Sequence, residues 1–364
     1  MELNMGLPLK ASWGKARRPI FGCRYWSEGW VDNLKMKLGS IRWLPLLLAG
    51  IVICTVLVLI KVNMARPGGN QPHILVMMKA IDPKIEFWNT VGAGIEAARK
   101  EFDVQVEVQG PDNEFDVEGQ IYKLKEALKS KPDAVVLVAS DYEALVPWAE
   151  KIRKQGIPLI MMDSGINSTA ANSFIATDNI AAGRKMGEVL SKLVDPSKQI
   201  AIVSHVQGTS TAIQREQGAR SGLSEALQKS VVGTYFSNGS EDRAYEITKE
   251  LLIARDDIGG IAGLNEITTV GAARAIKELG LKEQVKLVGF DSSTNEIKWI
   301  EEGVIQAVVI QKPFNMGYLG VKTAYEALQG KKVAPIIDTG SEVINKQNIY
   351  TIENQKLLFP FSSP

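Results

Sequence analysis

Hydrophobic and polar positions alternate regularly along residues 73–354, where short apolar runs are followed by longer amphipathic segments. Such runs are typical of buried parallel strands, and such segments of helices that cover a sheet. The pattern predicts strands at residues 74–78, 104–108, 134–138, 157–162, 173–177, 200–204, 231–236, 258–263, 285–290 and 305–311, with short strands near 336 and 341. It predicts helices at residues 86–102, 116–130, 143–155, 180–193, 211–228, 242–254, 268–279, 294–302 and 315–328. The alternation predicts an α/β fold of parallel sheets flanked by helices.

A second series of alternating strands and helices begins after residues 173–177, where Asp178 and Asn179 start a new helix. Asp178 is expected to cap that helix, because aspartate is a preferred N-cap residue. Two similar α/β units in one chain predict two lobes. A ligand would lie between them, since clefts between domains are common binding sites.

An apolar segment precedes this α/β body. Residues 43–60 carry no charge and are bounded by Arg42 and Lys61. At ~1.5 Å per residue this segment would span roughly 27 Å as a helix, enough to cross a bilayer. It predicts a transmembrane helix over residues 43–61. A cleaved signal peptide, or a lipid on Cys54, is the alternative.

Charge is distributed unevenly along the chain. Residues 1–42 contain eight Lys/Arg and three acidic residues, a net charge of +5, so the remainder of the chain carries about −4. A basic leader before an apolar span predicts that the N-terminus is cytoplasmic and the body extracytoplasmic. Residues 62–71 are predicted to form a linker. The mildly acidic body argues against a nucleic-acid partner.

Polar side chains follow five predicted strands at their carboxyl ends, which is where open parallel sheets bind ligands. These residues are Lys79, Asp163, Ser164, Asn265, Asp291 and Gln311. Arg215 lies on the helix after residues 200–204, and the aromatic pair Phe87 and Trp88 opens the first helix. Carboxylates, amides and arginine bind adjacent sugar hydroxyls in pairs, and an aromatic ring can stack on the apolar face of a sugar. The set predicts a sugar-binding site.

Each residue also has a structural interpretation when it is taken alone. Asp163 and Asp291 could cap helices, and Asn265 could be a turn residue. Arg215 could be an exposed helix charge, and Trp88 a core residue. Convergence at one set of strand ends favours the binding interpretation.

Catalysis finds less support in the sequence. Asp163 and Asp291 could form an acid/base pair as in glycosidases, but nothing near them in the sequence distinguishes this from two hydrogen-bond acceptors. The chain has only two histidines, His73 and His205, and no spacing typical of metal ligands. The sequence therefore predicts a binding protein without catalytic residues, metal or cofactor.

Several segments resemble the type I periplasmic sugar-binding proteins, the ribose-binding-like group that shares its core with LacI-type repressors. They include FWNTVGAGIEAARKE, GIPLIMMDSG, FIATDNIAAGR, QREQGARSGL, GLNEITTVGAARAIKELG and KLVGFDSSTNEIKWIEEG. The resemblance covers residues 73–354. It implies an N-terminal lobe of residues 72–177 plus 312–338 and a C-terminal lobe of residues 178–311 plus 339–364. The chain would cross between the lobes near Thr177, Gln311 and Thr339, and the lobes would close on the ligand like a hinge.

The resemblance also implies roles for the candidate residues. Phe87 and Trp88 match an aromatic pair that sandwiches the sugar ring. The positions that bind sugar polar groups in the family are matched by Asp163, Arg215, Asn265, Asp291 and Gln311. Ser164 stands where ribose binders carry arginine, so a hexose, xylose, an inositol-like polyol or a furanosyl signal molecule is an alternative to ribose.

Two functions are compatible with this resemblance. One is an extracytoplasmic receptor that delivers a monosaccharide or polyol to the permease of an ABC importer. The alternative is a membrane-anchored sensor that signals to a histidine kinase or a similar partner. A LacI-type transcription factor is excluded, because an apolar span stands where a helix-turn-helix would precede the body.

Overall fold

The structure is a computed structural model that describes residues 48, 50–55 and 71–359. The chain divides into two compact units, Met1–Gly69 and Asn70–Pro364. In the first unit, residues 48 and 50–55 are helical and Cys54 is exposed. Within the part of the chain that is described, no helix is long and apolar enough to cross a membrane. The leader, most of the span predicted at residues 43–61 and nearly all of the linker lie outside the described residues.

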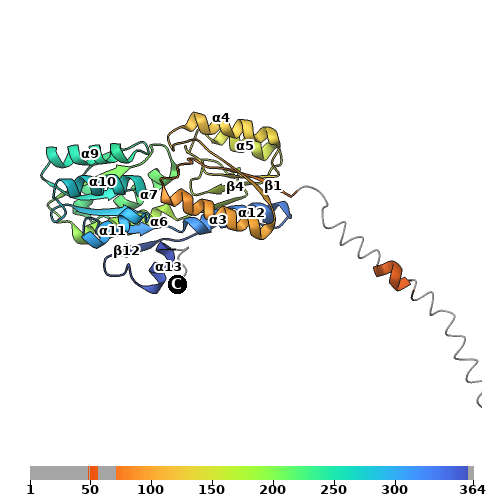
Figure 1. Ribbon diagram of the computed structural model, residues 1–364. Coiled ribbons are helices and arrows are strands. Elements are labelled where there is room, and N and C mark those ends of the chain that lie inside the picture. Colours follow the sequence, from red (N-terminus) through yellow and green to blue (C-terminus); the bar gives the residue numbers. More distant parts are fainter. Residues whose placement is uncertain (1–47, 49, 56–70, 360–364) are drawn as a thin grey trace, which may run out of the picture. The chain divides into compact units, whose positions relative to one another are not determined.

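The second unit contains two six-stranded sheets (Figure 1). The first has the order β11-β5-β4-β3-β1-β2 and is parallel throughout. Its strands are β1 (His73–Met77), β2 (Gln105–Gln109), β3 (Ala134–Leu137), β4 (Leu159–Met162), β5 (Ser173–Ala176) and β11 (Ile336–Asp338). The second has the order β12-β10-β9-β8-β6-β7, with only β12 antiparallel to its neighbour. Its strands are β6 (Gln199–Ser204), β7 (Val231–Phe236), β8 (Ile258–Gly263), β9 (Lys286–Phe290), β10 (Ala307–Ile310) and β12 (Glu342–Asn345).

Helices cover both faces of the first sheet because successive strand side chains point to opposite faces. Ile74 and Val76 of β1 pack in one hydrophobic cluster, under α3 (Glu86–Phe102) and α12 (Pro313–Leu328). Leu75 and Met77 pack in another, under α4 (Val117–Ala127) and α5 (Val146–Lys154). A short 3-10 turn, η1 (Leu128–Ser130), extends α4. This sheet and its helices form the first lobe.

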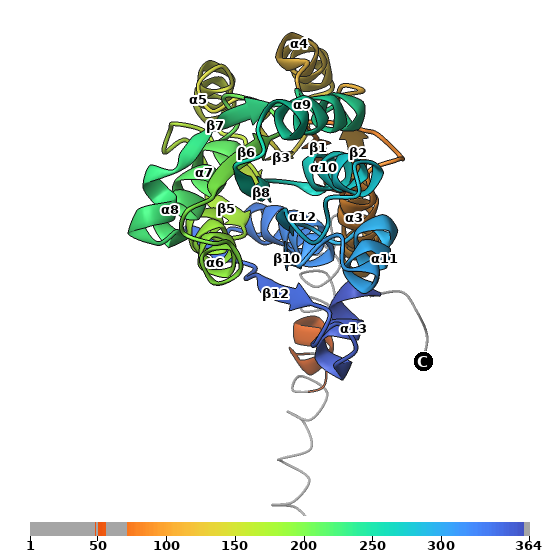
Figure 2. The ribbon, with the colours of Figure 1, turned by 90° about the vertical axis from the view of Figure 1, so that its left-hand side faces the viewer.

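The second lobe has the same arrangement, a sheet covered by helices on both faces. Figure 2 shows it facing the viewer, with α9 (Glu241–Ala254), α10 (Glu266–Glu278) and α11 (Thr294–Glu302) on one side of its sheet. On the other side lie α6 (Asn179–Leu193), α7 (Ser210–Gly222) and α8 (Glu225–Lys229). Ala201 and Val203 of β6 pack towards the first group of helices, and Ile200 and Ile202 towards the second. The two-lobed α/β fold expected from the sequence is confirmed.

Two helix predictions need correction. The single helix predicted at residues 211–228 is broken into α7 and α8, because Leu223 is extended (φ −69°, ψ 145°). Packing on α6 explains the break: a Cβ on Gly222 would lie 2.1 Å from the backbone oxygen of Arg184, and the N–H of Ser224 donates to Ser191 Oγ on α6 (2.7 Å). In addition, α13 (Ile352–Leu358) was not predicted, because its seven residues are too few for a clear helical period.

The chain passes between the two sheets three times, after β5, after β10 and after β11. The passages after β5 and after β11 are joined by a hydrogen bond. Asp338 Oδ1 accepts hydrogen bonds from the N–H groups of Asp178 (3.0 Å) and Gly340 (2.8 Å). Asp178 in turn caps α6 by accepting from the N–H of Ala181 (2.9 Å), as the sequence predicted.

Candidate ligand-binding site

The carboxyl ends of both sets of parallel strands meet at one cavity between the lobes. Eight of the nine predicted site residues line it: Lys79, Phe87, Trp88, Asp163, Arg215, Asn265, Asp291 and Gln311. The ninth, Ser164, is buried directly behind the cavity, where its Oγ accepts a hydrogen bond from Lys79 Nζ (3.3 Å). The unfilled space between these side chains is about 290 Å³ when the open solvent at its mouth is counted. The structure therefore brings together every residue that the strand-end pattern had selected.

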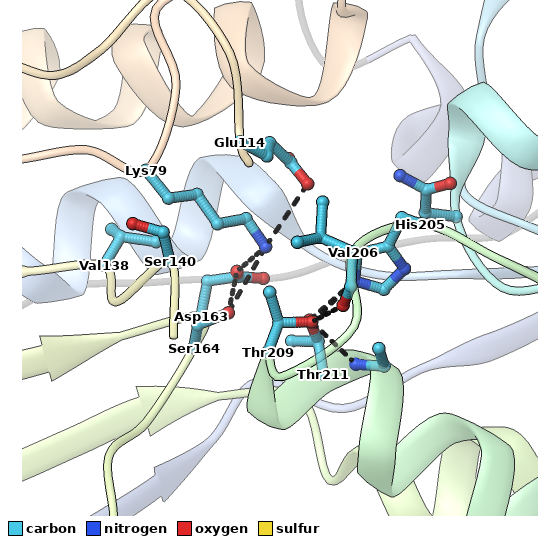
Figure 3. A network of polar contacts seen from close by, with 12 residues as sticks. Lys79, Glu114, Val138, Ser140, Asp163, Ser164, His205, Val206, Thr209 and Thr211 are labelled. Carbon is cyan, nitrogen blue, oxygen red and sulfur yellow. Dashed lines mark hydrogen bonds and ion pairs between the residues drawn. The ribbon is translucent and has the colours of Figure 1, made fainter. Parts of the chain in front are cut away.

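Lys79 is the second residue after the end of β1. It is only 3% exposed. Its Nζ lies 3.1 Å from Asp163 Oδ2 and 3.9 Å from Glu114 Oε2 (Figure 3). The same ammonium group lies 5.2 Å from the centroid of the Trp88 ring. A buried ammonium group needs such partners, because an unpaired buried charge is very costly. Lys79 thus fixes Asp163 and presents a positive charge to the cavity.

Asp163 and Asp291 occupy equivalent positions in the two lobes. Each comes directly after a parallel strand, each has a left-handed backbone (φ 57° and 76°), and each donates its N–H to the next strand, at Ile175 (2.9 Å) and Val309 (3.0 Å). Aspartate tolerates this conformation better than most residues, but it still costs on the order of 1–3 kcal/mol. Neither residue caps the helix that follows it. Their strained turns instead direct two carboxylates into the same cavity.

Arg215 is held rigidly by its neighbours. Its Nε donates to Asn179 Oδ1 (2.8 Å) and its Nη1 to the carbonyl of Leu264 (2.8 Å). The guanidinium group lies over the Phe290 ring, 4.4 Å from the centroid. These contacts leave Nη2 to donate into the cavity. Arg215 is therefore a buried residue that lines the cavity rather than an exposed helix charge.

Asn265 and Gln311 are oriented by bonds that use only part of each amide. Asn265 caps α10, with its Oδ1 accepting from the N–H of Thr268 (3.0 Å), so its amide NH₂ remains for the cavity. Gln311 Nε2 donates to Asp291 Oδ1 (2.7 Å), which leaves its Oε1. Burial raises the pKa of the Asp291 carboxyl, while the Arg215 guanidinium and this bond oppose the rise.

The aromatic pair does not form two parallel walls. The rings of Phe87 and Trp88 meet edge to face, with centroids 4.7 Å apart and planes at 85°. Only one of them can therefore lie flat against a given sugar ring. Trp88 is 6% exposed, packs in the core of the first lobe and donates from Nε1 to Glu114 Oε1 (3.0 Å). Phe87 is the more accessible of the two rings.

Besides the apolar Ile85, three further residues that line the cavity, all of them polar, were missing from the predicted set: Glu114, His205 and Glu266. His205 directly follows β6, so the strand-end rule could have selected it. Burial lowers its pKa well below the usual value, so it is neutral, and Nε2 pairs with the hydroxyls of Thr209 and Thr211. Glu114 lies in the loop after β2, several residues past the strand end. No local pattern in the sequence marks it.

Three of the eight buried side-chain polar atoms that lack a hydrogen-bond partner among the described residues belong to side chains that line this cavity. They are Glu114 Oε2, His205 Nδ1 and Gln311 Oε1. An unmade hydrogen bond at a buried polar atom costs about 1–3 kcal/mol. A molecule that carries several hydroxyls could satisfy all three atoms. The arrangement is therefore suited to a polyhydroxylated ligand.

Two glutamates bridge the lobes beside the cavity. Glu266 of α10 accepts from the N–H groups of Glu86 (3.1 Å) and Phe87 (3.0 Å) at the start of α3, whose own N-cap residue, Ile85, makes no side-chain bond. Glu86 in turn accepts from the N–H (3.0 Å) and Oγ1 (3.2 Å) of Thr294 at the start of α11. Each lobe thus supplies acceptors to the first N–H groups of a helix in the other lobe, which have no partner within their own helix.

Comparison with known proteins agrees with this architecture. The family model of the periplasmic binding protein domain matches residues 74–332. The chain belongs to this family. Together with the sugar-binding relatives described next, the match makes the chain a type I periplasmic sugar-binding protein.

Three relatives show how this periplasmic binding protein compares with others. The crystal structure of a sugar transporter from Clostridium phytofermentans is 39% identical, with a TM-score of 0.72, and the match covers 76% of this chain and all of that one. An ABC transporter solute-binding protein from Agrobacterium vitis with bound D-fucose is 33% identical, with a TM-score of 0.76 and coverage of 79% and 99%. The ribose import binding protein of Haemophilus influenzae is 30% identical over 193 residues, which are 53% of this chain and 65% of that protein.

Proposed function

We propose that this protein is an extracytoplasmic receptor that closes on a monosaccharide or related polyol and delivers it to an ABC importer. The observation that carries the proposal is the convergence of the nine strand-end and helix residues at one cavity between two lobes. Carboxylates, two cationic side chains and two amides there can pair with neighbouring hydroxyls on all sides of a ring. The relative with bound D-fucose supports this class of ligand.

We assign Asp163, Asp291, Arg215, Asn265 and Gln311 to the sugar hydroxyls, and Phe87 to the apolar face of the ring. Lys79 serves as a further hydroxyl contact, with Ser164 as its support. Closure would occur about the three passages between the sheets, with lobe boundaries at residues 177, 311 and 338. The contacts of Glu86 and Glu266 support a closed arrangement that both lobes stabilise.

The extracytoplasmic location rests on the family and on the basic leader before the apolar segment. The membrane anchor over residues 43–61 stays a prediction from the sequence, since most of that segment lies outside the described residues. The alternative function, a sensor that signals to a histidine kinase, depends on this anchor and also stays a prediction.

Calorimetric titration of the purified full-length chain tests the proposal, with a panel of pentoses, hexoses, inositols and furanosyl compounds. We expect one sugar to bind with a Kd of about 1 μM or lower, in the usual range of a specific small-molecule site. Asp163→Ala and Asp291→Ala should each abolish binding at millimolar sugar. Asp256→Ala, at an exposed position of the second lobe, is the matched control. If no compound binds the wild type, the assignment of these residues to a sugar is wrong.

A further inference from the structure

A gap between two opposite charges lies at the edge of the cavity. Lys79 Nζ and Glu114 Oε2 are 3.9 Å apart, which is too far for a direct hydrogen bond. Both groups are almost fully buried, with side chains 4% and 5% exposed, and Figure 3 shows the two charged ends pointing towards each other. Two such groups held apart in a buried site are unusual, because a direct pair would recover more of the cost of burial.

The positions of both groups are fixed by other bonds. Lys79 Nζ donates to Ser164 Oγ (3.3 Å) and forms an ion pair with Asp163 Oδ2 (3.1 Å), so at least one of its three N–H donors remains. Glu114 is held by its other oxygen, because Oε1 accepts from Trp88 Nε1 (3.0 Å). Its Oε2 has no hydrogen-bond partner among the described residues. One donor and one acceptor, both unused, therefore face the same gap.

We propose that Glu114 is a ligand-contacting residue that determines specificity, and that one free hydroxyl of the bound sugar bridges Glu114 and Lys79. The inference rests on the proposed sugar-binding function. A hydroxyl placed about 2.8 Å from both atoms fits a gap of 3.9 Å, and it can accept from the ammonium group while it donates to the carboxylate. An ether oxygen can accept from the ammonium group but cannot donate to the carboxylate. The carbon of a deoxy analogue can do neither. Glu114 would thus require a free hydroxyl at one position of the ring.

Loss of a hydrogen bond inside a closed polar site is costly. A site built to bind a hydroxyl rejects an analogue without it more strongly than an apolar pocket rejects an extra methyl group, because its own polar groups are left unpaired. The deoxy analogue would leave both Lys79 and Glu114 without a partner in the gap. We therefore expect deoxygenation at this one position to weaken binding by roughly 10–100-fold.

Glu114→Gln distinguishes a direct contact between Glu114 and the sugar from a role in which Glu114 only supports Trp88. Glutamine has nearly the same shape, and its Oε1 can still accept from Trp88 Nε1, but it then turns an amide NH₂ towards the gap. Two donor groups would face each other across the gap, so the hydroxyl no longer has an acceptor there. Glu118→Gln, an exposed position four residues further along, is the matched control.

The experiment is calorimetric titration of the wild type, Glu114→Gln and Glu118→Gln with the tightest-binding sugar of the panel and with its single-position deoxy and O-methyl analogues. We expect one position at which deoxygenation and O-methylation weaken binding by 10–100-fold in the wild type and in the control. In Glu114→Gln the cost at this position should be severalfold smaller, because the charge-assisted bond to the carboxylate is gone while Lys79 still loses its partner. Glu114→Asp, which withdraws the carboxylate from the gap, should behave like Glu114→Gln. It provides the same comparison if the glutamine variant does not fold.

The other outcomes each exclude something specific. Deoxygenation costs that are equal in the wild type and Glu114→Gln at every position would overturn the role of Glu114 while leaving a sugar receptor. A uniform weakening of all analogues would make Glu114 only a support for Trp88, which also overturns the proposal. If no sugar binds the wild type, the proposed function fails and this inference fails with it.

Discussion

Replacement of Glu266 by glutamine should change the way in which stability depends on pH. Glu266 lies at the start of α10 and is 7% exposed, and its carboxyl group accepts two hydrogen bonds from the N–H groups of the first residues of α3 in the other lobe. Burial raises its pKa from 4.5 to about 8, with the nearby Asp291 and Glu86 carboxylates adding to the rise and the two N–H groups opposing it. At neutral pH it is therefore largely protonated in the folded protein.

The direction of the effect follows from this difference in pKa. The folded protein holds the Glu266 proton more tightly than the unfolded chain does, so protonation stabilises the fold fully below pH 4.5. The contribution is lost as the pH rises towards 8. With these two pKa values the loss between pH 6 and pH 8 is about 2 kcal/mol. Glutamine cannot ionise, so the variant lacks this term.

Urea unfolding at pH 6, 7 and 8 measures the effect. The free energy of unfolding of Glu266→Gln relative to the wild type should increase by about 2 kcal/mol across this range. The buried carboxyls of Asp291, Glu114 and Glu296, whose pKa values are also raised, are present in both proteins and largely cancel in the comparison. Parallel pH profiles for wild type and variant would refute the reasoning, because they would place Glu266 in water rather than between the lobes. Glu250→Gln, on the exposed face of α9, controls for loss of a surface charge.

Four further substitutions have expected outcomes. Glu86→Ala removes the acceptor for both Thr294 donors, so the closed form should weaken and the Kd for the sugar should rise severalfold; an unchanged Kd in calorimetry would contradict this. Arg215→Lys removes the planar guanidinium group, which contacts three partners in the wild type. Sugar affinity should therefore fall at least tenfold, while the circular dichroism spectrum stays unchanged. Gly183→Ala should destabilise the protein by about 1–3 kcal/mol, because its Cβ would lie 2.3 Å from the backbone oxygen of Arg215. Gly92→Ala, with open space around the added carbon, should instead stabilise by about 0.5–1 kcal/mol, and equal melting temperatures for the two glycine variants would contradict the packing argument.

The fold was predictable because its determinants are local. Apolar runs such as those of β3 and β4 are buried on both faces and bounded by turn residues, so their period identifies them without tertiary information. The break between α7 and α8 was not predictable in this way. It depends on contacts of Gly222 with Arg184 and of Ser224 with Ser191 in α6, each more than 30 positions earlier in the chain. Helical periodicity continues through the break, so the sequence alone favours one long helix.

In the candidate site, too, some residues can be predicted from local sequence and others only from contacts between distant segments. Residues that directly follow a strand, such as Asp163 and Asp291, are identified by position, since all strands of a parallel sheet end at the same edge. His205 obeys the same rule and could have been included. Glu114 and Glu266 could not be assigned from the sequence, because their surroundings come from segments distant in the chain. Glu266 contacts residues 179 and 180 positions away.

The equivalence of Asp163 and Asp291 explains how two lobes can make one site. Each aspartate leaves its sheet in the left-handed conformation and is tied by its N–H to the following strand, so the strained turn is set by its own lobe before the lobes meet. Such strain persists only where the surrounding structure determines it. Each lobe therefore contributes a carboxylate whose direction is already fixed. The proposed closure would need only to bring these two halves together around a ligand. The contacts that would differ between an open and a closed form are those between the lobes, of which Glu86 and Glu266 supply four.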